Sequence, residues 1–332
     1  MPVTLAQAKL NATDKIDVRV IDEFRKSSWL LDNITFDDSV VPSGGSTLVY
    51  GYTRLITQPT AGFRAINAEY TPQEVTKQRY TTEPRPLGGS FQIDRVLDDM
   101  SAGAETSLQL QQKIKATRAK FADAAINGDV GVDANGFDGL DVALTGSTTE
   151  YKPADNGVAA GYLDWTTIAT QADAFAAMAH LDAMLALLDE RPSALLGNSK
   201  LIARIVNIAR FAHASTDPVD AFGGRVSTYN GIPLIDLGDK PGATTPIVEI
   251  ETRDADEGGA GGNITGLTDL FAARLGLDGF HAVSLRGRAP IRTYLPDFST
   301  PGAVKTGEVE MIASIALKAT KAAAVLRNIK VQ

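Results

Sequence analysis

Two segments typical of β-strands flank a polar stretch that is too long for an ordinary turn. Residues 47–57 are rich in β-branched and aromatic side chains, and residues 79–94 carry the returning strand. Residues 58–78, between them, hold few large apolar side chains. A segment this polar cannot fill a core, and it is much longer than the usual hairpin loop of roughly two to five residues. The pattern therefore predicts a β-hairpin that extends away from the body of the protein.

A long amphipathic helix is predicted after this hairpin, over residues 102–127. Leu110, Ile114, Thr117, Phe121 and Ala125 recur at spacings of three and four, which places them on one helical face. At about 1.5 Å per residue, the helix would be roughly 40 Å long. Few compact domains need a helix of that length, so an elongated body is expected.

The first 45 residues are predicted to form an arm and not a domain. Near its end lies an apolar cluster of Trp29, Leu30, Leu31, Ile34 and Phe36. Side chains of this kind need cover. The cover comes either from the chain's own core or from a neighbouring molecule.

Helical patterns alternate with short strand patterns between Asp164 and Leu285, which predicts a mixed α/β domain. One helix is expected over residues 166–188, capped by Asp164, and another over residues 200–211, capped by Asn198 and Ser199. The first would bury Ile168, Ala172, Phe175, Met178, Leu181, Leu185 and Leu188. The candidate strands are 193–196, 226–229, 232–236, 247–251 and 280–285. A short β stretch is expected to open at residues 136–140, and a long strand or strand pair at residues 309–329.

Composition excludes several kinds of chemistry. The chain has no cysteine, so disulfides, thiolate metal sites and cysteine nucleophiles are ruled out. Its three histidines, at 180, 213 and 281, lack metal-ligand spacing. The formal charge of -8 disfavours broad phosphate neutralisation as the main role. No signal peptide or long apolar segment is visible.

Catalytic signatures are also missing. Gly197-Asn198-Ser199-Lys200-Leu201 lacks the final glycine of a nucleophile elbow, and no phosphate-binding Gly-Lys-Ser/Thr triplet occurs. The loop with Asp254, Asp256 and Glu257 before a glycine run is either a solvated loop or a calcium site. The basic residues Lys113, Lys115, Arg118 and Lys120 are either a solvated helix face or a weak, sequence-blind contact to nucleic acid.

The sequence thus shows no catalytic motif, but it has an apolar arm, a hairpin and a long helix whose surfaces need cover. The order of these segments resembles that of a known family. Arm, extended hairpin, long helix, compact α/β domain and returning strand follow one another as in tailed-bacteriophage major capsid proteins of the HK-ninety-seven-type fold. The local matches are residues 136–140 after the long helix, residues 192–199 before a helix, and residues 229–235. The resemblance covers nearly the whole chain, and the order of its motifs carries it.

The resemblance implies an α+β fold with four parts. Residues 1–45 would be the N-terminal arm and residues 46–92 the extended loop. Residues 93–150 and 288–332 would form a peripheral domain with a long spine helix, and residues 151–287 an axial domain. Many family members carry a scaffolding segment before the arm; here the arm begins almost at Met1, which implies a separate scaffolding protein. A cross-link between Lys77 and Asn328, of the kind some members form, is a minor alternative. Intersubunit contacts are expected at Trp29, Leu31, Phe36, Arg64, Glu69, Lys77 and Arg79.

The function implied is that of a structural protein and not of an enzyme, with no cofactor. Its subunits would form hexamers and pentamers of an icosahedral shell around packaged double-stranded DNA. The other expected partners are a portal protein and a decoration protein, with DNA held only by weak, non-specific contact. Such a shell belongs to a virion assembled in the cytoplasm of a bacterial host. An encapsulin-type nanocompartment shell is the alternative with the same fold, and an uncharacterised hydrolase is the alternative from another class.

Overall fold

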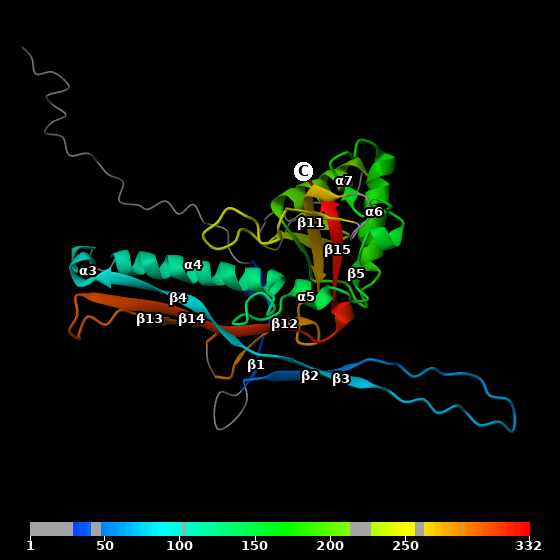
Figure 1. Ribbon diagram of the computed structural model, residues 1–332, viewed down its shortest axis with the longest axis horizontal. Helices are drawn as coiled ribbons and strands as arrows, with labels where there is room; N and C mark the ends of the chain where they lie inside the picture. Colours follow the sequence, from blue (N-terminus) through cyan, green and yellow to red (C-terminus); the bar gives the residue numbers. More distant parts are fainter. Residues whose placement is uncertain (1–28, 41–47, 102–103, 213–226, 256–261, 288) are drawn as a thin grey trace, which may run out of the picture.

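The computed structural model describes residues 29–40, 48–101, 104–212, 227–255, 262–287 and 289–332. These residues form an elongated body with a globular part at one end and a thin hairpin that projects from it (Figure 1). The hairpin consists of β2 (Tyr50–Leu55) and β3 (Lys77–Thr82), which pair antiparallel. The projecting hairpin predicted from the polar stretch is thus present.

A five-stranded sheet forms the elongated part of the body. Its longest ladder joins β4 (Arg85–Asp94) to β14 (Val304–Leu317), from the pair Arg85–Ala313 to the pair Asp94–Val304. The other strands are β1 (Phe36–Val40), β12 (Phe280–Leu285) and β13 (Ile291–Tyr294). Helix α3 (Arg95–Ser101) follows β4, and α4 (Ala104–Asn127) then runs back along the sheet (Figure 1).

Helix α4 is the predicted long helix, but only three of the five residues of its predicted apolar face are buried. Thr117, Phe121 and Ala125 of the predicted stripe are buried, whereas Leu110 and Ile114 remain partly exposed. Its 24 residues correspond to about 36 Å at 1.5 Å per residue. The helix therefore supports the extended end of the body while its C-terminal half enters the core.

An eight-stranded sheet forms the globular part, with helices α6 (Gln171–Leu185) and α7 (Ser199–Phe211) packed on it. Its central strands are buried along most of their length, because helices and loops cover both faces. The strands are β5 (Glu150–Tyr151), β6 (Leu163–Asp164), β7 (Ala194–Gly197), β8 (Thr228–Tyr229), β9 (Ile232–Asp236), β10 (Glu251–Asp254), β11 (Asn263–Ala273) and β15 (Ala323–Lys330).

Helix α6 differs from the prediction in its start and in its buried face. Thr170 is its N-cap and forms a capping box with Asp173, so the helix begins five residues later than expected. Asp164 instead accepts hydrogen bonds from the backbone and hydroxyl of Thr166. The buried face is Ala174, Ala177, Leu181 and Met184; of the predicted stripe only Leu181 is fully buried, and Phe175 is exposed.

Other predicted elements also needed correction. Residues 136–139 have no regular secondary structure and lead into α5 (Leu140–Leu144), where a β stretch was expected. Residues 247–250 are not a strand, although Ile247 and Val248 are buried in the core. Residues 309–329 hold two strands, β14 and β15, which lie in different sheets. The third helix, by contrast, has the predicted cap, because Asn198 accepts a hydrogen bond from the Leu201 amide.

Sheet membership does not follow the expected division of the chain. Strand β12, from the range assigned to the axial domain, pairs with β14 in the five-stranded sheet. Strand β15, from the range assigned to the peripheral domain, pairs with β11 in the eight-stranded sheet. The chain thus crosses between the two sheets more than once, and the four-part division stays a prediction.

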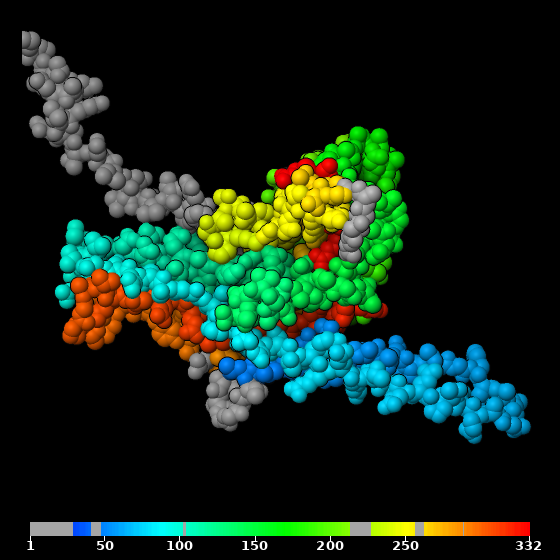
Figure 2. Space-filling view, in the orientation of Figure 1, coloured from blue at the N-terminus to red at the C-terminus, as the bar shows by residue number. Residues whose placement is uncertain are grey.

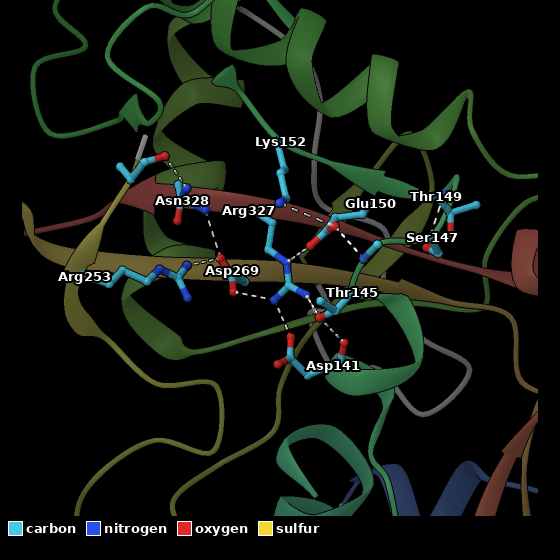
Figure 3. A network of polar contacts seen from close by, with 12 residues as sticks. Asp141, Thr145, Ser147, Thr149, Glu150, Lys152, Arg253, Asp269, Arg327 and Asn328 are labelled. Carbon is cyan, nitrogen blue, oxygen red and sulfur yellow. Dashed lines mark hydrogen bonds and ion pairs between the residues drawn. The ribbon is translucent and has the colours of Figure 1, made fainter. Parts of the chain in front are cut away.

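A buried polar network ties α5 to the eight-stranded sheet. Arg327 of β15 donates to Glu150 of β5 at 2.9 Å, to Asp269 of β11 at 3.0 Å and to Asp141 of α5 (Figure 3). A further bond reaches the Thr145 hydroxyl at 2.9 Å. Charges buried this deeply are stable only when paired. The network therefore fixes the position of α5, which follows the spine helix, against the sheet.

Candidate assembly surface

The end of the predicted arm packs inside the chain. Trp29 and Leu31 lie on α2 (Trp29–Asn33), which packs against α4, and Phe36 begins β1, which pairs parallel with β12. Leu30 is fully buried, while Trp29, Leu31 and Phe36 are partly buried against the same core. These apolar side chains were predicted as contact residues because they need cover, and the core of the same subunit provides at least part of that cover. Their contact with a neighbour stays a prediction, and residues 1–28 lie outside the described chain.

The hairpin is anchored to the body at Tyr50. Its hydroxyl donates to Asp37 of β1 at 2.7 Å and lies 3.3 Å from Nε2 of His281 on β12. The Lys318 ammonium lies 5.5 Å from the centre of the Tyr50 ring and 3.8 Å from the Asp37 carboxylate. Burial and the hydrogen bond to Asp37 raise the pKa of Tyr50, so its proton stays on the hydroxyl.

A second anchor lies four residues further along β2, at Arg54. Its guanidinium donates to the carbonyl oxygens of Lys318, at 3.1 Å, and Leu317. It also lies 4.3 Å from the ring centre of Tyr80, which stacks on Tyr52 across the hairpin at 5.8 Å. These contacts hold the base of the hairpin at the end of β14.

Beyond this base, the hairpin leaves the body entirely. Every residue from Leu55 to Arg79 is exposed, and Figure 2 shows the ribbon projecting into solvent. Side chains replace part of the ladder: the Thr57 and Thr76 hydroxyls lie 2.8 Å apart, and Gln73 donates to the Thr60 hydroxyl at 2.6 Å. The ribbon is therefore ordered by contacts within itself and not by a core.

The tip of this ribbon exposes apolar side chains. A turn closes it, with the Ala68 amide bonded to the Ala65 carbonyl at 3.1 Å and Asn67 in the left-handed region at φ 70°. Phe63 and Ile66 are almost fully exposed, and Tyr70 is exposed beside Arg64, whose guanidinium lies 5.4 Å from its ring centre. Apolar side chains gathered on a ribbon without a core are typical of an interaction surface. We call residues 55–79 the hairpin tip.

Four of the predicted contact residues lie on this tip. Arg64, Glu69, Lys77 and Arg79 are all exposed, and Arg79 lies across the backbone at Gly51. The structure does not bring them together with Trp29, Leu31 and Phe36 in one surface. All seven therefore remain predicted, and untested, intersubunit contacts. Asn328, proposed for a cross-link with Lys77, donates its side-chain amide to the carbonyls of Gly161 and Ala255.

A second exposed apolar surface lies at the opposite end of the body, and the sequence interpretation missed it. It comprises Val96, Leu97 and Met100 of α3, Tyr294 and Leu295 at the end of β13, and Val304 at the start of β14. Helix α3 has no buried residue. Val96, Leu97 and Met100 are spaced three and four apart, so the sequence places them on one helical face, but their position beside β13 and β14 is visible only in the fold. We call these six residues the distal patch.

The remaining candidate sites have structural explanations or lie partly outside the described chain. Of the basic residues on α4, Arg118 pairs with Asp32 and Lys120 with Asp123. Asp256 and Glu257 of the acidic loop are not described. No group of metal-ligating side chains is found among the described residues.

The ring of His180 shares one hydrogen bond with the Tyr151 hydroxyl, at 2.8 Å, and His213 is not described. A cavity of about 250 Å³ lies between β6 and α6. No helix in the described chain could span a membrane.

Comparison with known proteins identifies the fold. No protein-family model matches the sequence, and no curated protein sequence does. Solved structures match over nearly the full chain. The SrpI encapsulin of Synechococcus elongatus is 15% identical, with a TM-score of 0.61 over 100% of this chain and 98% of its own. The capsid of a native GTA particle is 15% identical, with a TM-score of 0.59 over 98% of this chain and 97% of its own.

A phage structure extends the same similarity. The capsid of Myoviridae phage XM1 is 10% identical, with a TM-score of 0.55 over 98% of this chain and 99% of its own. The chain therefore has the α+β, HK-ninety-seven-type capsid fold, as predicted from the order of its segments. At these identities the similarity establishes the fold, which both phage capsids and an encapsulin share.

Proposed function

We propose that this protein is the major capsid protein of a tailed bacteriophage, building hexamers and pentamers of an icosahedral shell around double-stranded DNA. The observation that carries the proposal is the hairpin tip. It is a fully exposed ribbon with an apolar end on a fold that shell proteins share. A monomer gains nothing from such a ribbon, whereas an assembly buries it.

The second copy of the chain is the partner that suits the tip. The tip carries Arg64, Lys77 and Arg79 against Glu69 and Glu74, so its charge is 3 − 2 = +1. Residues 94–99, which include the start of α3 beside the distal patch, carry Asp94, Asp98 and Asp99 against Arg95, so their net charge is −2. Tip and distal patch lie at opposite ends of the molecule (Figure 1). A contact between two different surfaces of identical subunits propagates and can close into a ring.

A cysteine pair tests this contact directly. The chain has no cysteine, so Gly62→Cys with Met100→Cys places two unique thiols, one on the tip and one on the distal patch. Oxidation of the assembled protein is expected to give a ladder of disulfide-linked oligomers on a non-reducing gel. The matched control pairs Gly62→Cys with Val132→Cys, an exposed apolar site on the loop after α4. Equal ladders from both pairs would contradict the docking.

The remaining partners follow from a phage capsid role. They are a separate scaffolding protein, a portal protein, a decoration protein and packaged DNA in weak contact, and the shell would form in the host cytoplasm as part of the virion. Electron microscopy of the expressed protein, alone and with the scaffolding protein, tests shell formation. Stable monomers at high concentration in both samples would reject the proposal.

An encapsulin-type shell is the second candidate, because the SrpI encapsulin matches this fold over the whole chain. The contents of purified shells separate the two functions. A DNA phage capsid yields nuclease-protected double-stranded DNA when isolated from infected cells. A nanocompartment yields a protein cargo and no protected DNA.

A further inference from the structure

The outer face of helix α6 is apolar and exposed. Its members recur at helical spacing and are Ala172, Phe175, Ala176 and Ala179. The largest of them, Phe175, is 53% exposed. The inner face of the same helix already packs in the core of the eight-stranded sheet. The outer face is therefore not needed for the fold of the subunit, and it is typical of a surface that another molecule covers.

The cavity between β6 and α6 lies beside this face, because Ala176 belongs to both. Its volume is about 250 Å³. Leu163 and Ala177 give it a buried apolar wall, whereas Asp173 in the same lining is exposed. A cavity of about 150 Å³ accommodates benzene, so this one has room for an aromatic side chain. The outer face of α6 thus offers a recess with an apolar wall and a carboxylate at its rim.

The charges around this recess are mostly negative. Helix α6 exposes Asp173 and Asp182 and carries no lysine or arginine. Asp164 of β6 adds a third carboxylate to the lining, and it lies 3.8 Å from the ammonium of Lys330. A partner that suits this face therefore presents an apolar side chain next to a positive charge.

The end of helix α7 has this combination. The helix carries Lys200, Arg204 and Arg210 and no acidic residue. Lys200 bonds to the side chain of Gln332 within the subunit, whereas Arg210 is exposed. Phe211 follows Arg210 directly and is 42% exposed, and it does not line the cavity of its own subunit. Both helices lie on the outside of the globular part (Figure 1).

We propose that α6 of one subunit binds the end of α7 of a second copy, with Phe211 in the cavity between β6 and α6 and Arg210 paired with Asp173. The proposal rests on the self-assembly proposed above, and it adds a contact between globular parts to the contact made by the hairpin tip. Because the two surfaces differ, the contact repeats from subunit to subunit and can close into a ring. The buried aromatic ring would supply most of the affinity, and the ion pair would fix the orientation.

Two single-cysteine subunits test this contact. The chain has no cysteine, so Ala179→Cys and Asn207→Cys each place one thiol on an exposed position of α6 or α7, outside the cavity and one turn from its proposed contacts. The two full-length variants are assembled together and treated with a short bismaleimide cross-linker. A linked dimer is expected from the mixture and not from either variant alone. The matched control mixes Ala179→Cys with Val142→Cys, at an exposed position of α5, and is expected to give no dimer.

A second substitution in the Asn207→Cys subunit tests the named side chains. Phe211→Ser is expected to lower the yield of linked dimer by about tenfold or more, because it removes the side chain that the contact buries. Arg210→Glu is expected to lower it as well, because it places a carboxylate against Asp173. Val132→Ser, at an exposed valine elsewhere, is expected to leave the yield unchanged. All three positions are exposed, so the melting temperatures should stay close to that of the wild type.

The outcomes separate this contact from the capsid proposal. No dimer from the mixture, equal yields from the mixture and the control, or a yield that Phe211→Ser leaves unchanged would each overturn the contact. Shells in electron micrographs without the linked dimer would reject the contact and leave the capsid proposal standing. A dimer that depends on Phe211 in a preparation that forms no shells would support the contact and count against the capsid.

Discussion

The hairpin and the eight-stranded sheet divide two tasks within one chain. In the sheet, β11 is buried from Gly266 onward, and Arg327 pairs with the buried carboxylates of Glu150 and Asp269 and with the partly exposed Asp141 of α5. In the hairpin tip every residue is exposed, and the apolar side chains Phe63 and Ile66 have no cover. Stability of the subunit therefore resides in the sheets, whereas the tip contributes surface that only a partner can bury. The comparison predicts opposite effects of mutations in the two regions.

The largest effect on stability is expected at Arg327. Arg327→Met removes the cation that the buried carboxylates of Glu150 and Asp269 share, and leaves them only Lys152, at 4.0 Å, and Arg253; this should lower the free energy of unfolding by about 3–5 kcal/mol. Denaturant titration measures it. Arg274→Met is the control, since its partners Glu190 and Asp278 are largely exposed, and it should lower the free energy of unfolding by about 1 kcal/mol or less. Equal losses in both variants would mean that the buried network does not hold the fold.

The next effect is expected at Leu30, at the end of the arm. Leu30→Ala removes a fully buried side chain and should lower the free energy of unfolding by about 2–5 kcal/mol. Leu97→Ala, at an exposed leucine of the distal patch, should change it by less than about 0.5 kcal/mol. A Leu30→Ala variant as stable as the wild type would contradict this, and would mean that the segment around Leu30 serves contacts between subunits and not the fold of the subunit. Deletion of residues 1–36 is accordingly expected to damage folding as well as assembly, because it removes α2 and the first residue of β1.

The smallest effect on stability, and the largest on assembly, is expected at the tip. Phe63→Ser combined with Ile66→Ser should change the free energy of unfolding by less than about 0.5 kcal/mol. The yield of shells in electron micrographs should fall sharply, because each side chain buried in a contact stabilises it by about 1.5–3 kcal/mol. Val132→Ser, at an exposed valine elsewhere, should leave the yield unchanged. A loss of stability in the double variant would assign the tip to the fold.

Local signals in the sequence predicted local structure well. The polar stretch indicated the projecting hairpin, and Asn198 indicated the start of α7, because both depend on neighbouring residues alone. The helix α6 was predicted, but its predicted start was wrong because Asp164 and Thr170 both suit a cap. The capping box with Asp173 decides between them. The buried face with Ala174 and Ala177 is set by packing against the core of the eight-stranded sheet, which the sequence does not specify.

Long-range pairing could not be predicted in the same way. β14 and β15 are separated by only a short turn yet enter different sheets, and nothing in their alternation of side chains specifies a partner. For the same reason, the sequence did not decide whether Trp29 and Leu31 pack on the chain's own core or on a neighbouring molecule. Their packing on α4 is a contact between distant segments, which composition does not encode. The distal patch was missed because its members come from α3, β13 and β14 and meet only in the fold.

The central claim is that the hairpin tip serves assembly and not folding. Replacing residues 59–78 with a short Gly-Ser turn tests it most directly, by thermal melting beside electron microscopy of the same preparation. Loop closure should change by only about 1 kcal/mol. The account predicts a melting temperature close to that of the wild type, together with the loss of shells. A collapsed melting temperature, or intact shells from the shortened protein, would contradict it.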